Sequence, residues 1–487
     1  MPDQVPETAD QRGQRLAKLE AIKAAGGEAY SLSYDRTHTA GEVLAAYPDL
    51  PPGSDTGAQV SVAGRMMSHR RHGKLAFADL VDATGRIQLM AQADRMGDAI
   101  DAFGEVDVGD WIGARGTVVT TKRGELTVLI DEFEMLSKCL RPLPDNWHGL
   151  KDVETRYRQR YLDLIANPDG RRAVMARSAV VPAIRRRLTD AGYLEVETPM
   201  LHPIPGGALA RPFETFHETL NMTLYLRIAP ELYLKRLLVG GMEKVFEINR
   251  SFRNEGVSVQ HNPEFTMLEL YEAFADYNEM ASLLEQIVQA GAAALGERSA
   301  FEFQGETISL ETPFRRATML QLLEEAGVDT AGDLQTECKR LDVSFDPSWP
   351  WGKLLVELYE KTVEKSLMQP VFVMDYPKEV SPLARGHRTD DRFTEHLDLV
   401  IGGMEVGVAY SELTDPFEQR ARFEAQAGTR EGRETTEVID EDFLRALEYG
   451  MPPAGGLGFG IDRFLMILTG QPSIREVIAF PALRPEQ

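Results

Sequence analysis

Cysteine is scarce in this sequence: the 487 residues include two, Cys139 and Cys338. These lie about 200 positions apart and form no CxxC pair, which excludes a disulfide framework and a cysteine-based zinc cluster. Long apolar runs are also missing, since no stretch reaches the ~18 apolar residues of a membrane span. The amino terminus, MPDQVPETAD, is acidic and no apolar segment follows it. We therefore expect a soluble, cytoplasmic protein with no membrane partner.

Several common catalytic patterns are absent. The chain has no GxxxxGK[ST] loop, no GxSxG, no HExxH and no GxGxxG after a strand. These absences argue against a P-loop nucleotide fold, a serine hydrolase, a zinc protease and a Rossmann domain. If the protein uses a nucleotide, it does so on another kind of scaffold.

Positive charge is in deficit, with 53 Lys and Arg against 76 Asp and Glu and a net charge of −23. Taken as a sum, this charge opposes nonspecific binding to nucleic acids. Its distribution is uneven, because residues 61–150 carry 11 cations and 13 acids and are nearly neutral. Within them, Arg65 to Lys74 contains four cations and no acid, and Phe77 follows in a β-rich run. Cations beside a strand-borne aromatic suit single-stranded nucleic acid, although the composition alone favours a solvated basic hairpin.

The hydrophobic pattern predicts a multidomain α+β protein. Residues 1–57 read as a helical lead-in, and 58–140 contain about five short strands with turn signals, typical of a small closed barrel of the oligonucleotide-binding (OB) type. An SH3-like barrel or a sandwich fits that pattern almost as well. A linker at 141–156 leads to a domain at 157–487 in which antiparallel strands are flanked by helices. Residues 277–365 read as a helical insertion with one hairpin around Gln304-Gly305.

Two segments concentrate unusual polar residues. Phe246 to Phe274 reads FEINRSFRNEGVSVQHNPEFTMLELYEAF, and alternation predicts Arg253 and Glu255 on one side of a strand that a loop joins to a second strand. A charged fork, a histidine and an aromatic face can hold a phosphate and an adenine. The second segment, GLGFGIDR, ends on Arg463 at the predicted start of an apolar helix, where a triphosphate can bind side chain and helix terminus together.

These blocks resemble the three signature motifs of class II aminoacyl-tRNA synthetases: GYLEVETP (192–199) as the dimer-forming motif 1, the Arg253 segment as motif 2, and GLGFGIDR as motif 3. Longer strings such as LYLRIAPELYLKRLLVGGMEKVFEINRSFRNEG and ALEYGMPPAGGLGFGIDR resemble bacterial lysyl-tRNA synthetases. The resemblance extends from about residue 11 to Pro485. It implies an amino-terminal OB-fold barrel, a class II catalytic domain, and a homodimer that joins L-lysine to tRNA(Lys) through a lysyl-adenylate.

The resemblance also implies roles for particular residues. ATP would contact Arg253 at the α-phosphate, Glu255 at the adenine amino group, Phe265 and Arg463 on the two faces of the ring, and the loop residues His261 and Asn262. Arg253, Glu255 and Arg463 are the expected catalytic set. The expected lysine-binding residues are Gly207, Glu231, Glu269, Tyr271, Tyr410 and Glu412. Mg²⁺ is the expected cofactor, held by Asp398 and by Glu405, which also belongs to the ATP site. The expected anticodon-binding residues are Arg65, Phe77, Gln88 and Glu132.

Two positions depart from the family pattern. The segment before Glu412 often reads NGFSEL in the family, but this chain has Val408-Ala409-Tyr410-Ser411-Glu412-Leu413, so a polar amide is missing. Asp398 stands where many members have glutamate, which shortens one metal ligand by a methylene. Both departures concern the tightness of the substrate and metal sites more than the reaction.

Three rival functions share parts of this pattern. An aspartyl or asparaginyl enzyme has the same domain layout, but Glu231, Glu269 and Glu412 would repel an aspartate side chain. A paralogue that lysylates a protein would be expected to lack the barrel. A noncatalytic tRNA-binding relative would be expected to lack Arg253, Glu255 and Arg463, and this chain has all three.

Overall fold

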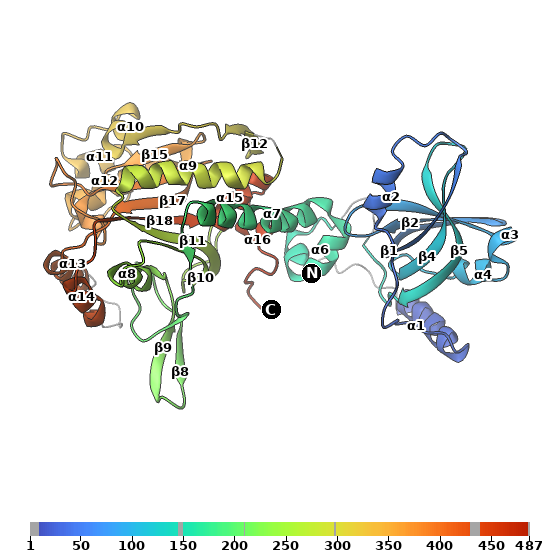
Figure 1. Cartoon of the computed structure of the whole chain (residues 1–487). Helices are drawn as coiled ribbons and strands as arrows, with labels where there is room; N and C mark the ends of the chain where they lie inside the picture. The colour runs from blue at the N-terminus through green and yellow to red at the C-terminus, as the bar shows by residue number, and fades with distance from the viewer. Residues whose placement is uncertain (1–8, 145–149, 209, 297–298, 429–438, 486–487) are drawn as a thin grey trace. The chain divides into compact units, whose positions relative to one another are not determined.

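The computed structural model describes residues 9–144, 150–208, 210–296, 299–428 and 439–485. The chain divides into two compact units, Met1–Ala166 and Asn167–Gln487 (Figure 1). Among the described residues, no helix is both long enough and apolar enough to cross a membrane. Cys139 is half-buried, Cys338 is buried, and both are free thiols, as their spacing predicted.

The first unit is built on a closed five-stranded barrel with the strand order β1-β2-β3-β5-β4. Its strands are β1 (Asp55–His72), β2 (Leu75–Val81), β3 (Arg86–Gln92), β4 (Trp111–Thr120) and β5 (Leu126–Ser137). Its helices are α1 (Ala9–Ala24), α2 (Ala40–Ala46), α3 (Ala93–Met96), α4 (Ala99–Gly104), α5 (Val153–Arg158) and α6 (Arg160–Ala166). Closure comes from β1 pairing with β4 and from the parallel pair β3–β5. The expected barrel is confirmed, and helices α3 and α4 lie between β3 and β4.

Strand alternation decides which barrel residues face outward. Met66, Ala76, Ala78, Leu89 and Ile130 are buried in the barrel core. Because successive side chains on a strand point to opposite faces, their neighbours in sequence point away from that core.

The second unit contains an eight-stranded sheet in the order β14-β15-β16-β17-β18-β11-β10-β6. Its strands are β6 (Leu194–Glu195), β10 (Lys244–Phe252), β11 (Glu264–Ala273), β14 (Arg315–Thr318), β15 (Val371–Met374), β16 (His396–Ile401), β17 (Met404–Ser411) and β18 (Ala454–Gly460). Neighbouring strands are antiparallel except at the two edges, where β14–β15 and β6–β10 are parallel. Successive antiparallel strands agree with the predicted α+β class.

Two smaller sheets accompany the large one. They are formed by β7 (Leu201–His202), β8 (Glu214–His217) and β9 (Met222–Leu226), and by β12 (Ala300–Phe303) and β13 (Glu306–Ser309). The second of these is the hairpin expected around Gln304-Gly305, since Phe303 pairs with Glu306.

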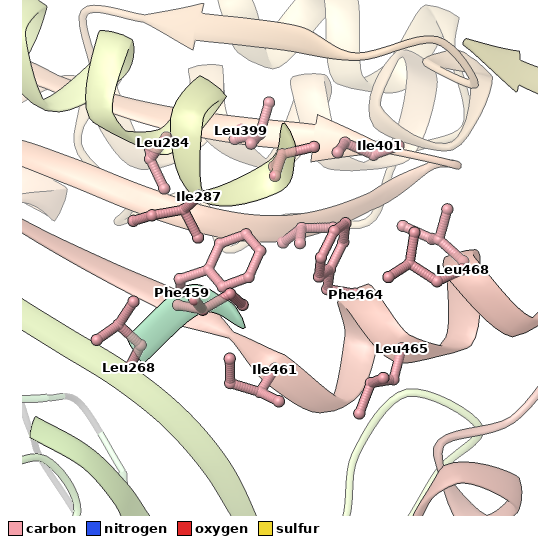
Figure 2. Close-up of a cluster of buried hydrophobic side chains, with 14 of the residues drawn as sticks. Leu268, Leu284, Ile287, Leu399, Ile401, Phe459, Ile461, Phe464, Leu465 and Leu468 are labelled. Carbon is pink, nitrogen blue, oxygen red and sulfur yellow. The ribbon is translucent and has the colours of Figure 1, made fainter. Parts of the chain in front are cut away.

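Helices cover the large sheet. They are α7 (Pro168–Asp190), α8 (Glu231–Val239), α9 (Tyr277–Ala293), α10 (Met319–Glu325), α11 (Leu334–Arg340), α12 (Trp351–Thr362), α13 (Pro416–Gly428), α14 (Glu441–Glu448), α15 (Ile461–Thr469) and α16 (Ile474–Val477), with 3₁₀ turns at Glu364–Ser366 and Lys378–Val380. Helices α7, α9 and α15 pack together on one face (Figure 1). Figure 2 shows the core beneath them, where Leu284 and Ile287 of α9 meet Phe459 of β18 and Phe464 of α15.

The opposite face of the same sheet is polar near its centre. Leu268 and Leu270 of β11 lie in the core under α9, whereas Tyr271 packs with Leu232 of α8 and Phe443 of α14. One face of the sheet therefore packs on a continuous apolar core, and the other face is available for a functional site.

Candidate active site

Alternation along β11 assembles one wall of a cavity. Phe265, Met267, Glu269 and Tyr271 have odd numbers and line the cavity, while the even-numbered Leu268 and Leu270 are fully buried in the core. Successive side chains on a strand point to opposite faces, so a strand with one apolar and one polar face shows alternating apolar and polar residues in the sequence.

Glycines on β18 leave the space for that cavity. Gly456 pairs with Tyr271, and Gly458 pairs with Glu269, so these glycines share the cavity face, while Leu457 and Phe459 lie in the core. A Cβ at Gly456 would stand 2.1 Å from Glu412 Oε1 and 2.5 Å from the Tyr271 ring. Any side chain there would collide with both, so the Gly-rich run is required by packing against two expected lysine-binding residues.

The cavity has a volume of about 670 Å³. Twelve of the expected ATP- and lysine-binding residues line it: Gly207, Glu231, Arg253, Glu255, His261, Asn262, Phe265, Glu269, Tyr271, Glu405, Tyr410 and Arg463. Asp398 and Glu412 are both buried and do not line it. The segments that the sequence singled out therefore converge on one site, although they come from positions spread over some 250 residues of the chain.

Cations gather at one end of the cavity. The Arg253 guanidinium lies 5.1 Å from the centre of the Phe265 ring. Strand β10 ends at Phe252, so Arg253 and Glu255 lie in the loop after the strand, and their predicted position on the strand itself was wrong. The Arg253 amide donates to the Pro263 carbonyl (2.8 Å), which closes the loop and holds the side chain over the aromatic face.

Arg463 and His261 are joined across the same end. Arg463 Nη2 donates to His261 Nε2 (3.1 Å), and Nη1 donates to the Glu405 carbonyl (2.6 Å). Burial and the nearby Arg463 charge lower the pKa of His261, so the ring is neutral and its Nδ1 donates to Ser258 Oγ (2.8 Å). The motif 2 loop is thereby tied to the first turn of α15.

Neighbouring residues anchor this end. Asp462, in the first turn of α15, accepts from Arg177 of α7 and from the Thr266 amide (2.8 Å). Asn262 is buried, donates to the Glu264 carbonyl (2.7 Å) and accepts from the Ala482 amide (3.2 Å). Both side-chain groups of Asn262 are thus engaged with the backbone, so in this conformation it holds the loop that carries His261.

Carboxylates gather at the other end. Glu269 is buried, and its burial together with the neighbouring Glu231 raises its pKa to about 8. Burial also raises the pKa of Glu412 to about 7, against the opposing effect of Lys235. Lys235, on α8, lies between two acids, with Nζ 2.6 Å from Glu231 Oε1 and 2.5 Å from Glu412 Oε2. A cationic ligand would relieve the like-charge repulsion at this end.

The expected metal ligands lie on adjacent strands, Asp398 on β16 and Glu405 on β17. Burial raises the pKa of Glu405, and Asp398 adds to this rise while Arg463 opposes it. These two carboxylates form an oxygen donor set suited to a hard divalent cation. No cluster of three or more metal-ligating side chains occurs in the part of the chain that the structure describes, so a cation here would also need phosphate or water oxygens.

The two departures from the family pattern are direct neighbours. Asp398 pairs with Val408 across β16 and β17, and Val408 lines the cavity. The shorter carboxylate is held by His396, whose Nε2 donates to Asp398 Oδ1 (2.8 Å), while Ser381 Oγ bonds Nδ1 (2.7 Å). His396 also stacks between Tyr376 and Tyr410, at ring distances of 4.0 and 4.5 Å.

The four expected anticodon residues all lie on outward-facing positions of the barrel. Phe77 and Gln88 are diagonal neighbours on the paired strands β2 and β3. Gln88 is opposite Asp79, which follows Phe77 by two residues on the same face of β2. Arg65 donates to the Gly109 carbonyl (2.7 Å) and lies over the Trp111 ring. Glu132 is exposed and pairs with Arg115 at 3.6 Å. The structure thus brings Phe77 and Gln88 close together, and it links Arg65 and Glu132 to other barrel residues.

Two cavity features were missed from the sequence. Lys235 follows Glu231 by four residues, the spacing of an ion pair on one helix face, and this signal could have been read. The Ser381–His396–Asp398 chain had no local signal, since Ser381 lies fifteen residues from His396 in an irregular segment.

Comparison with known proteins agrees with this geometry. Residues 152–484 match the family model of class II tRNA synthetases (D, K and N), and residues 60–136 match that of OB-fold nucleic acid binding domains. The chain is 50% identical over 479 residues to the lysine–tRNA ligase of Carboxydothermus hydrogenoformans, covering 97% of both chains. It is also 50% identical over 485 residues to that of Synechococcus sp. (strain RCC307), covering 98% of this chain and 96% of the relative. This chain therefore belongs to the lysine–tRNA ligases of the class II tRNA synthetase family.

Proposed function

We propose that the cavity binds ATP at its arginine-rich end and L-lysine at its acidic end, and that the chain joins lysine to tRNA(Lys) through a lysyl-adenylate. The observation that carries this proposal is that one cavity is lined by two arginines, Arg253 and Arg463, and by two acids, Glu231 and Glu269. The two arginines suit a triphosphate, and the two acids suit a substrate with two ammonium groups.

In the first step, the carboxylate of lysine attacks the α-phosphorus of ATP and pyrophosphate leaves. Arg253 neutralises charge on the α-phosphate, and Phe265 provides a face for the adenine. The adenine amino group donates a hydrogen bond to the Glu255 carboxylate. Arg463 lies on the other face of the ring and reaches the γ-phosphate. No protein nucleophile takes part, so orientation and electrostatic stabilisation supply the rate.

Lysine recognition rests on the acidic end. Glu231 and Glu269 are the acids that line the cavity there, and binding of an ammonium group favours the charged form of Glu269, whose pKa is about 8 in the free site. Tyr271 and Tyr410 form the apolar walls along the methylene chain, and Gly207 leaves room for the α-amino group. An aspartate side chain meets repulsion at the same place, which disfavours the aspartyl and asparaginyl rivals.

Asp398 and Glu405 are the residues that would hold Mg²⁺. Their oxygen chemistry fits this cation, which typically uses one or two carboxylates and completes its coordination with phosphate and water oxygens. When bound, Mg²⁺ offsets negative charge on the nucleotide phosphates.

In the second step, a ribose hydroxyl of the terminal tRNA adenosine attacks the carbonyl carbon of the lysyl-adenylate, and AMP leaves as the ester bond forms. The barrel recognises the anticodon, with Phe77 stacking on an unpaired base and Arg65, Gln88 and Glu132 contacting the others. The chain acts as a homodimer through the segment 192–199, in the cytoplasm.

The decisive experiment is ATP–pyrophosphate exchange with lysine, aspartate or asparagine as the amino acid. Exchange that depends on lysine and not on the other two is the expected result, and its absence would contradict the proposal. Charging of tRNA(Lys) transcripts with altered anticodons then tests the barrel. Undiminished charging of these transcripts would remove the role assigned to Phe77 and its neighbours.

A further inference from the structure

Lys235 is a fully buried cation directly behind the acidic end of the cavity. Its side chain is 0% exposed, as against 12% for Glu231 and 1% for Glu412. On α8, the four-residue spacing brings Lys235 over Glu231, and the end of β17 brings Glu412 to its other side. One ammonium group therefore joins two of the acids expected to recognise lysine, but it does not line the cavity itself.

The charge on Lys235 is secured by its surroundings. Burial alone favours the neutral amine, but the two carboxylates outweigh it and raise the pKa of Lys235. The Tyr271 ring adds a cation–π contact at 5.8 Å. Other charges near this end are already paired, Arg236 with Asp440 and Arg227 with Glu247. The charged and titratable groups facing Lys235 and its acids are Glu231, Glu269, Tyr271, Tyr410 and Glu412, and Arg253, Glu247 and Arg227 also act on Glu269.

The charge balance of this end matches the substrate. When ionised, Glu231, Glu269 and Glu412 carry three negative charges, and Lys235 cancels one. Two negative charges remain, which equals the number of ammonium groups on a lysine molecule. Without Lys235, the site would bury one carboxylate more than the substrate can neutralise, and burial of an unpaired charge is resolved by protonation.

We propose that Lys235 is a positioning residue for lysine selection: its ammonium group holds Glu231 and Glu412 in place and cancels one of the negative charges at this end, so that the pocket offers two uncompensated negative charges to a diammonium substrate. This inference rests on the proposed lysine site. It adds a resident cation to the acids that are expected to recognise lysine.

The main variant is Lys235→Met in the full-length protein, assayed by lysine-dependent ATP–pyrophosphate exchange. We expect the KM for lysine at pH 7 to rise by on the order of 100-fold, the range found when one partner of a buried charge pair is removed. We expect kcat to change less than about threefold, because Lys235 touches no reacting atom. The ratio of the variant KM to the wild-type KM should shrink as pH rises from 7 to 8.5, since the carboxyl that protonates in the variant regains its charge.

Two further variants separate charge balance from packing. In Lys235→Met with Glu412→Gln, one acid and the cation are removed together, so the remaining charge again matches lysine and the KM should return toward the wild-type value. Lys138→Met is the matched control, because Lys138 is 1% exposed and bridges Asp107 and Asp110 at 2.5 and 2.7 Å in the barrel. It removes a buried lysine between two acids elsewhere, and the KM for lysine should be unchanged.

The outcomes are distinct. A KM ratio that is constant with pH, or a double variant that binds lysine more weakly than Lys235→Met alone, would overturn the proposal. If Lys235→Met does not fold, as judged by its thermal transition, the double variant decides alone, and a KM more than about 100-fold above wild type would overturn the proposal. Absence of lysine-dependent exchange in the wild-type protein would instead reject the proposed function.

Discussion

Glu269 is a residue at which stability and function oppose each other, and its replacement by glutamine tests this directly. Glu269 is 6% exposed, and the pKa of its carboxyl is raised from 4.5 to about 8, chiefly by burial and secondly by Glu231. A rise of this size corresponds to at most ~5 kcal/mol of destabilisation once the unfolded chain is fully ionised. Because a glutamine amide must also be desolvated, we expect a net gain of about 2 kcal/mol from Glu269→Gln.

The destabilisation of the folded state by Glu269 depends on pH in a definite direction. A carboxyl with a raised pKa in the folded state is protonated in both states below pH 4.5, so there it costs nothing. Its cost grows as pH rises from 4.5 to about 8, because the unfolded chain gains the charge first. The melting temperature of Glu269→Gln should therefore exceed that of the wild type by a few degrees at pH 7.5, and this difference should disappear near pH 4.5.

Bound lysine should reverse the order of the melting temperatures of the wild type and Glu269→Gln. Thermal unfolding is measured with and without lysine, and the wild type should gain more from the ligand than the variant, because only the wild type offers the charge of residue 269 to an ammonium group. In pyrophosphate exchange, the KM for lysine should rise by on the order of 100-fold in the variant. A variant that is less stable than the wild type at pH 7.5, with an unchanged KM, would refute the reasoning.

Three other predictions concern separate parts of the molecule. Val408→Asn places an amide opposite Asp398 on the neighbouring strand, and the KM for lysine or ATP should fall in exchange assays; unchanged kinetics would mean that the site compensates in another way. Phe77→Ala should lower tRNA charging by about 10-fold or more, the cost of one lost base stack, and leave tRNA-independent exchange unchanged; equal losses in both assays would indicate a folding defect instead. The affinity for tRNA should fall with a shallow logarithmic salt slope, corresponding to only a few phosphate contacts, because Arg71, Arg86, Arg95 and Arg115 are already paired with acids; a steep slope would show that these pairs open to bind phosphate.

Much of the fold followed from local pattern. The alternation in FTMLELYEAF predicted a strand, and the structure gives β11 with Leu268 and Leu270 in the core and Glu269 and Tyr271 on the cavity face. The turn residues Gln304-Gly305 predicted the hairpin of β12 and β13. These signals are short-range, since one strand or one turn contains all the residues that produce them.

The site was only partly accessible from the sequence because its contacts are long-range. Motifs identified the residues that line the cavity, but nothing local to Glu412 shows that its carboxylate contacts an internal lysine 177 positions earlier in the chain. The strand limit at Phe252 was also missed. Arg253 keeps the register of the ladder and donates to the Pro263 carbonyl, but proline has no N–H to return the second bond of the pair. Side-chain pairing across elements depends on strand order, which alternation does not determine.

The net charge of −23 is best understood as a by-product of two local requirements. In the proposed function, the catalytic unit presents carboxylates to cationic ligands: Glu231 and Glu269 to ammonium groups, and Asp398 and Glu405 to a divalent cation. The barrel needs little net charge if bases are recognised by stacking and hydrogen bonds rather than by phosphate attraction. An acidic protein of this kind repels RNA in general, so under this proposal binding depends on the few unstacked bases that reach the barrel. The same charge that opposes nonspecific contact therefore favours discrimination among RNAs.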